Sequence, residues 1–211
     1  MKKILSLALV VFTFVCVLSG CGSDIYYDGK YDSENFALNT DIDGVRFLIP
    51  VDYNNMKQTQ EEINKKLQSI KNENDKIKFI NSRVTYKTNG TDYQLVKPNE
   101  FFLYVLNLKG LKGVESFDDV ADLPKTFGIK KFISLEAGNV EKHSSVTKNG
   151  CTRSIFNANI KDLETRSEYY GYVSIIEDSS KGTVYAIIAG FGDKEHYNTT
   201  KAIAENFYLA E

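Results

Sequence analysis

The sequence predicts an α+β fold in which a mostly antiparallel sheet is flanked by helices on both faces, as in an α/β/α sandwich. Three observations predict this fold. Turn-forming residues stand between short apolar runs, which is the pattern of β-hairpins. One strand pair near the C-terminus is apolar on both alternating sides, as expected for central strands that are covered above and below. Helical periodicity appears at residues 59–74 and again at the end of the chain.

Two hairpins and a longer aromatic strand are predicted in the first half. The turns are Asp41-Ile42-Asp43-Gly44 and Asn89-Gly90, because such pairs favour tight turns between strands. Pro50 is expected to end the second strand, since proline cannot donate to a strand ladder. The five strands are expected at residues 35–40, 45–49, 83–87, 93–96 and 100–108.

Two helices are predicted between these strands and after them. Thr59 and Glu62 form a capping box at the start of a helix over residues 59–74. Its apolar face is expected to contain Ile63, Leu67 and Ile70. A short helix is predicted to begin at Ser116 with Asp119 and to be limited by Pro124.

The second half predicts two further hairpins and a final helix. Asn149-Gly150 joins strands at residues 140–148 and 151–160, and the next pair lies at residues 169–177 and 183–191. In this last pair Val173 and Ile175 point to one side, and Tyr172 and Ile176 point to the other. Asp193 can cap the final helix, whose shared face is expected to hold Tyr197, Ala204 and Phe207.

The N-terminus has the three parts of a secretory signal peptide. Lys2 and Lys3 make a positive end, residues 4–18 make an apolar run, and small residues follow at once. This run has 15 residues, whereas a membrane-crossing helix needs about 20. We therefore expect residues 1–20 to be removed.

Leu18-Ser19-Gly20-Cys21 resembles the lipobox of bacterial lipoproteins. The resemblance implies cleavage before Cys21 and a diacylglyceryl group on its sulfur, which would anchor the chain to a cell membrane on the extracytoplasmic side. Two acyl chains make a durable anchor, while one chain alone binds reversibly. Residues 21–34, polar and rich in Gly and Asp, are predicted to be a tether, and residues 35–211 a single domain.

Composition excludes some partners. Losing Lys2 and Lys3 with the signal peptide changes the formal net charge from −2 to −4, which gives no general attraction to nucleic acid. Cys16 would leave with the signal peptide and Cys21 would carry lipid. Cys151 then has no partner for an intrachain disulfide, so packing must stabilise the domain.

The order of elements is similar to the PsbP-like family of extracytoplasmic domains. The resemblance rests on Phe47-Leu48-Ile49-Pro50 with Tyr53 shortly after, a following helix, a long aromatic hairpin and a terminal Ala204-Glu205-Asn206-Phe207. The sequence departs from the family in having Tyr53 where a Trp is usual and Asn206 where a Ser is usual. The resemblance implies an α/β/α sandwich with a binding or adaptor role, and it transfers no catalytic residue.

A thiol dyad of Cys151 and His143 is not expected. If Asn149-Gly150 is a two-residue turn, Lys148 faces Cys151 and His143 faces Phe156. The thiol and the imidazole then point to opposite faces of the sheet, several residue pairs apart. A lone cysteine is more often a small buried hydrophobe, and this is the interpretation that we favour for Cys151.

No catalytic, cofactor-binding or metal-binding residue is predicted, and Cys21 is the one predicted site, for lipidation. His196, beside Glu195, has no second histidine or cysteine at metal-ligand spacing, which favours an exposed residue in the first helical turn. Asp41-x-Asp43-Gly44 and the acidic residues of 28–34 lack the alternating oxygen ligands of a calcium loop.

The sequence favours a non-enzymatic binding or adaptor module that binds an envelope protein or a ligand through its sheet edge or loops. Four tyrosines near the tether are candidates for that surface or for ordinary packing: Tyr26, Tyr27, Tyr31 and Tyr53. A cell-envelope hydrolase remains open, and it would need two acids, or His196 with an acid, to meet in a deep pocket. A carrier of a small hydrophobic ligand also remains open, and it would need an internal cavity.

Overall fold

The computed structural model describes residues 25–109, 121–122, 133–163 and 166–210. The predicted signal peptide and Cys21 lie outside the described residues, and so does most of the short helix predicted from Ser116 to Pro124. No helix in the described ranges is both long and apolar enough to cross a membrane.

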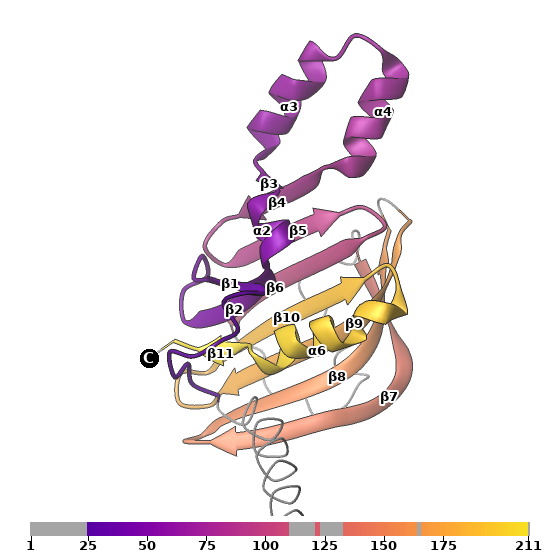
Figure 1. The fold of residues 1–211 in the computed structure, drawn as a ribbon. Coiled ribbons are helices and arrows are strands. Elements are labelled where there is room, and N and C mark those ends of the chain that lie inside the picture. The colour runs from indigo at the N-terminus through magenta and orange to yellow at the C-terminus, as the bar shows by residue number, and fades with distance from the viewer. Residues whose placement is uncertain (1–24, 110–120, 123–132, 164–165, 211) are drawn as a thin grey trace, which may run out of the picture.

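An eight-stranded sheet forms the body of the molecule (Figure 1). Its strand order is β3-β4-β5-β6-β10-β9-β8-β7, and every neighbouring pair is antiparallel except β3 with β4. The strands are β3 (Lys57–Gln58), β4 (Val84–Thr88), β5 (Asp92–Lys97), β6 (Phe101–Lys109), β7 (Ile133–Lys148), β8 (Cys151–Asp162), β9 (Glu168–Asp178) and β10 (Thr183–Phe191).

A second, three-stranded sheet has the order β1-β2-β11. It consists of β1 (Phe36–Asn39), β2 (Val45–Pro50) and β11 (Tyr208–Leu209), so the two ends of the domain meet in it. Tyr26 adds a parallel bridge to Leu209, and Ile25 is fully buried. Part of the segment predicted as a tether therefore packs against the domain.

The four predicted hairpins are confirmed as β1–β2, β4–β5, β7–β8 and β9–β10. Strand β7 is longer than predicted, and its pairing with β8 shifts on both sides of Lys142. Lys148 pairs with Cys151 as expected, but Phe156 pairs with Lys142 and not with His143. The bulge is the physical reason, because an extra residue in one strand displaces all pairing beyond it.

The helix predicted over residues 59–74 is present as α3 (Gln60–Ser69), which ends five residues earlier than predicted. A second helix that was not predicted, α4 (Glu73–Ser82), follows it. The capping box of Thr59 and Glu62 is present, and Asn72 caps the second helix by accepting from two backbone N–H groups. Figure 1 shows the pair projecting beyond the β3–β4 edge of the sheet. A short α2 (Val51–Asn55) precedes them, and η1 (Lys194–His196) leads into α6 (Tyr197–Glu205) near the C-terminus.

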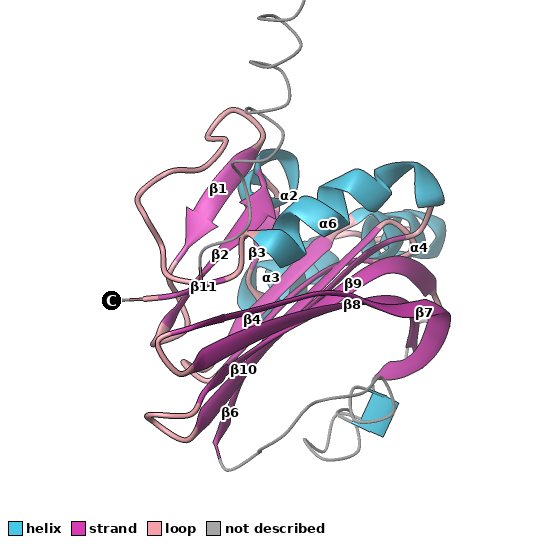
Figure 2. Cartoon of the chain, turned by 90° about the horizontal axis from the view of Figure 1, so that it is seen from below, coloured by secondary structure: helices cyan, strands magenta, loops and turns pink. Residues whose placement is uncertain are grey.

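The sheet curls, and one face carries both α6 and the three-stranded sheet (Figure 2). Apart from the helical residues 121–122, no described helix lies on the concave side, so helices on both faces are not found in the described residues. The large sheet instead curls so that its other face becomes the concave side (Figure 2). This curvature, and not a layer of described helices, encloses the concave side. The mixed, strand-dominated α+β class is as predicted.

Two apolar clusters lie on opposite sides of the sheet. The outer cluster, on the α6 side, includes Phe47, Leu103, Tyr185, Ile187 and Ile203. The inner cluster, on the concave side, includes Phe102, Leu106, Phe156, Val184 and Ile188. Strand β10 alternates between them, which confirms that this strand is central and buried on both faces.

Candidate functional site

A groove of about 470 Å³ opens where the start of β1, the β2–α2 junction and the first turns of α6 meet. Because β10 ends and α6 begins beside it, residues from both halves of the chain form its walls. The lining residues are Glu34, Asn35, Phe36, Pro50, Val51, Asp52, Tyr53, Phe191, His196, Asn198, Thr199 and Ala202. We call this site the α2–α6 groove.

Tyr53 fixes one wall of the α2–α6 groove. Its ring stacks on Phe101 with centroids 4.4 Å apart and meets Phe191 edge-on at 5.8 Å. Its hydroxyl donates a hydrogen bond of 2.8 Å to Glu100 Oε1, and Lys97 Nζ lies 2.6 Å from Glu100 Oε2. Only 9% of Tyr53 is exposed, so the side chain is a rigid part of the wall.

The pKa values of this cluster follow from those contacts. Burial, together with the hydrogen bond to Glu100, raises the pKa of Tyr53 well above its usual value, so the phenol stays protonated and acts as a donor. Burial opposes ionisation of Glu100, but hydrogen bonds from Lys97 and Tyr53 outweigh it and hold the pKa of that carboxyl below its usual value. The cluster is therefore an ionised carboxylate held between two donors.

His196 also lines the groove, in contact with Asp193. Its Nδ1 is 2.7 Å from Asp193 Oδ1, and its ring stacks on Phe191 with centroids 4.5 Å apart. The hydrogen bond with His196 lowers the pKa of Asp193. Asp193 Oδ1 also accepts from the backbone N–H of Glu195, which is the cap that the sequence predicts. The contact thus follows from a local cap three residues before the histidine.

The charge in the α2–α6 groove is acidic. Glu34 and Asp52 contribute exposed carboxylates, and no lysine or arginine is among the described residues that line it. Asn35, Asn198 and Thr199 add amide and hydroxyl groups that can donate or accept. This lining can hold a ligand that carries a positive charge beside an apolar part.

The catalytic capacity of the groove is small. An aspartate on His196 Nδ1 leaves Nε2 available as a general base, and these are two of the three members of a nucleophilic triad. Among the described residues, however, no hydroxyl or thiol is hydrogen-bonded to that imidazole. Nor do the described residues contain three His, Cys, Asp or Glu side chains grouped for a metal ion.

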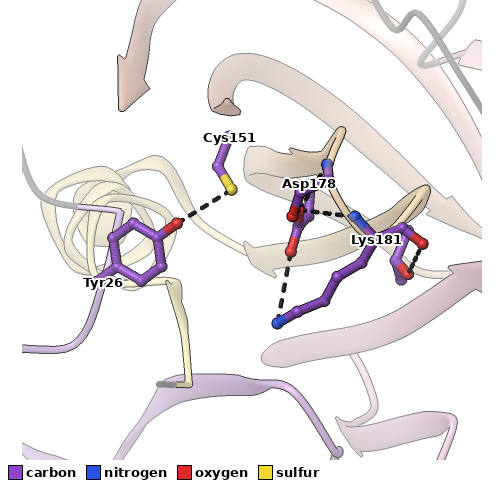
Figure 3. A network of polar contacts seen from close by, with 6 residues as sticks. Tyr26, Cys151, Asp178 and Lys181 are labelled. Atoms are coloured by element: carbon purple, nitrogen blue, oxygen red, sulfur yellow. Dashed lines mark hydrogen bonds and ion pairs between the residues drawn. The ribbon is translucent and has the colours of Figure 1, made fainter. Parts of the chain in front are cut away.

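Cys151 belongs to a different cluster, at the other end of β10 (Figure 3). Its Sγ lies 3.3 Å from Tyr26 Oη, and the residue is 1% exposed. Burial raises the pKa of this thiol, which agrees with the prediction of a small buried side chain. The contact with Cys151, together with burial, raises the pKa of Tyr26 to about 12.

Asp178 is the charged member of the Cys151 cluster, although it is only 2% exposed. Its Oδ1 accepts hydrogen bonds from Ser180 and from the backbone N–H of Lys181, and Lys181 Nζ lies 3.6 Å from Oδ2. Burial opposes ionisation of Asp178, yet these bonds hold its pKa below the usual value. Through these hydrogen bonds the Asp178 carboxylate stabilises the β9–β10 turn.

The four candidate tyrosines have separate positions. Tyr53 packs in the α2–α6 groove wall, Tyr26 contacts Cys151, and Tyr27 lies against Tyr208 with ring centroids 5.8 Å apart. Tyr31 is the one of the four classed as exposed, at 36%. They do not form one continuous surface.

The candidate calcium sequence at Asp41 is a turn, as favoured. Asp41 accepts hydrogen bonds from the side-chain amide of Asn39 and from the hydroxyl of Tyr86. These bonds stabilise the β1–β2 hairpin. Sequence reasoning missed the contact of Tyr53 with Glu100, because 47 residues separate them and no local pattern links them.

Comparison with known proteins adds no family assignment. No protein-family model matches the chain, and no curated protein matches it.

Proposed function

We propose that this chain is a lipid-anchored, non-enzymatic binding module of the cell envelope, and that the α2–α6 groove holds a cationic ligand. The observation that supports the binding role is the composition of the groove. The wall that contains Tyr53 is fixed by aromatic stacking and by the hydrogen bond to Glu100, while Glu34 and Asp52 are exposed lining residues. A preformed site with a few placed polar groups is typical of ligand binding.

The ligand class follows from charge complementarity. An ammonium or guanidinium group can donate to Asp52 and Glu34, and the adjoining aromatic wall can contact the carbon chain that carries it. An anionic ligand would meet two carboxylates with no lysine or arginine among the lining residues. We therefore expect a basic peptide segment or a polyamine to bind, and an acidic peptide of the same length not to bind.

Calorimetric titration of the purified lipoprotein in neutral detergent tests the binding role. The probes are tri-lysine and tri-glutamate peptides, and the variants are Asp52→Asn and the matched control Glu61→Gln. Glu61 is an exposed acid in the first turn of α3, outside the groove. Loss of one charged hydrogen bond should weaken tri-lysine binding about tenfold in Asp52→Asn only. Equal binding of both peptides, or equal loss in both variants, would contradict the proposed site.

The anchor is tested separately. Cells fed an alkyne fatty acid should label the wild-type chain, and Cys21→Ala should lose the label, because the thioether needs that sulfur. A Ser19→Ala chain keeps Cys21 and should keep the label. Labelling that survives in Cys21→Ala would contradict the lipoprotein assignment, and it would not bear on ligand binding in the groove.

A hydrolase is the second candidate, and the contact of His196 with Asp193 at the groove favours it. Its test is the release of fragments from cell-wall or peptide substrates by wild type and by His196→Gln. Turnover that His196→Gln abolishes would make the groove an active site. Fragment release at the same low background level by wild type and by His196→Gln would contradict the hydrolase and favour ligand binding as the function of the groove.

A further inference from the structure

The N-terminal segment is held against the domain from Ile25 onward. The carbonyl of Ile25 accepts a hydrogen bond of 2.8 Å from the N–H of Leu209, and the N–H of Tyr27 donates one of 3.3 Å to the Leu209 carbonyl. Between them, Tyr26 Oη lies 3.3 Å from Cys151 Sγ. These contacts, with a fully buried Ile25 side chain, fix the place where the chain enters the fold.

That place is beside two hairpin turns, which we call the turn end and define as residues 148–151 and 178–183. Cys151 pairs with Lys148 across the first turn and with Asp178 of the next strand. The N–H of Ser179 donates to the Gly150 carbonyl at 3.3 Å, so the two turns are joined. Figure 3 shows Tyr26 meeting this group of residues.

The α2–α6 groove lies at the other end of β10. This strand runs nine residues from Thr183, in the turn end, to Phe191, in the groove wall. At about 3.4 Å per residue the two ends are roughly 27 Å apart. By contrast, only three residues lie between Cys21 and Ile25, and the four Cα–Cα steps that join them span at most about 14 Å.

From this geometry we infer that the turn end is a lipid-facing surface, and that it holds the α2–α6 groove away from the membrane, open to the envelope space. The inference rests on the proposed anchor at Cys21. Since the link from Cys21 to Ile25 is shorter than β10, the surface next to Ile25 must stay close to the lipid. Lys148 and Lys181 are exposed on the two turns, where their charges suit the phosphates of lipid headgroups.

Depth-dependent quenching on vesicles tests the orientation. Full-length Ser179→Cys and Glu195→Cys lipoproteins are labelled with a small fluorophore and added to vesicles of phosphatidylcholine and phosphatidylglycerol that contain a headgroup-linked quencher. Ser179 is exposed in the turn end and Glu195 is exposed in η1 at the groove end. The wild-type chain, labelled in parallel, corrects for Cys151, and circular dichroism checks that both variants fold.

The Ser179→Cys label should be quenched several-fold more than the Glu195→Cys label. Equal quenching, or stronger quenching at position 195, would overturn the orientation. Co-flotation of the protein with the vesicles is measured first, because it shows whether the chain is anchored, and Cys21→Ala is the control. Chains that do not float show that the anchor fails and the orientation falls with it, whereas chains that float with reversed quenching show that the orientation alone is wrong.

Discussion

At the scale of single residues, the hydroxyl of Tyr53 links the groove wall to a charged pair. We predict that Tyr53→Phe lowers the free energy of unfolding by about 1 kcal/mol or somewhat more, because a buried donor to a carboxylate is lost while the ring stacking remains. Tyr86→Phe is the matched control, since its hydroxyl bonds to Asp41 near the surface. Urea denaturation measures both. A larger loss in Tyr86→Phe would contradict the role given to Tyr53.

The lowered pKa of Glu100 predicts a pH dependence of stability. A carboxyl whose pKa is lower in the folded chain stabilises it above the unfolded value, near 4.5, and loses this effect as pH falls through the folded value. The stability difference between wild type and Glu100→Gln should therefore be full at pH 7 and should shrink below about pH 4.5. Denaturation at a series of pH values measures it, and a difference independent of pH would refute the prediction.

The thiol of Cys151 should be inert in the folded chain. It is 1% exposed, and its pKa is raised by burial, so little reactive thiolate is present at neutral pH. We predict that alkylation of the peptide containing Cys151, followed by mass spectrometry, is slow without denaturant and rises steeply through the unfolding transition. Rapid alkylation of the native chain would show that the contact between Tyr26 and Cys151 opens in the folded state and exposes the thiol.

At the scale of elements, the α3–α4 pair is the least supported part of the described fold. Helix α4 has no buried residue, and α3 has one, Ile63. Ten-residue helices are marginal without tertiary packing. Local caps therefore carry much of their stability, so removing the cap at Thr59 should loosen α3 without unfolding the sheet.

Hydrogen exchange tests this local stability. We predict that amides of α4 exchange far faster than those of β9 and β10, and that Thr59→Ala speeds exchange in α3 by the equivalent of about 1 kcal/mol. Thr59→Ser keeps the capping oxygen and should leave the exchange rates nearly unchanged. If Thr59→Ala lowered the melting temperature of the whole domain strongly, α3 would be part of the main cooperative unit.

The sequence predicted the hairpins correctly, because the residues that form each turn are adjacent in the chain. The sequence Asn149-Gly150 sets the β7–β8 hairpin, and both residues take the positive φ that such a turn requires. The bulge at Lys142 has no comparable signal, so the pairing of His143 was wrong. The early end of α3 and the whole of α4 were missed, because α4 buries no residue and its sequence therefore carries no strong apolar periodicity.

At the scale of the whole molecule, the groove could be predicted only in pieces. The Asp193 cap and its neighbour His196 are three residues apart and visible in the sequence. The contacts of Tyr53 with Glu100 and Phe191, by contrast, exist only once β6 and β10 pair. The same limit applies to the curl, because the sequence shows that β10 is apolar on both sides but not what covers each side.

The curl bears on whether the molecule carries a hydrophobic ligand inside. Ile187 and Ile188 are neighbours in β10, both fully buried, with Ile187 in the outer cluster and Ile188 in the inner cluster. If the inner cluster is a packed core, Ile187→Ala and Ile188→Ala should each cost about 2–5 kcal/mol, because each leaves a cavity among fixed neighbours. Urea denaturation compares the two. A carrier would instead show a small cost for Ile188→Ala and a changed amount of co-purified lipid, since a fluid ligand can fill the space that the isoleucine leaves.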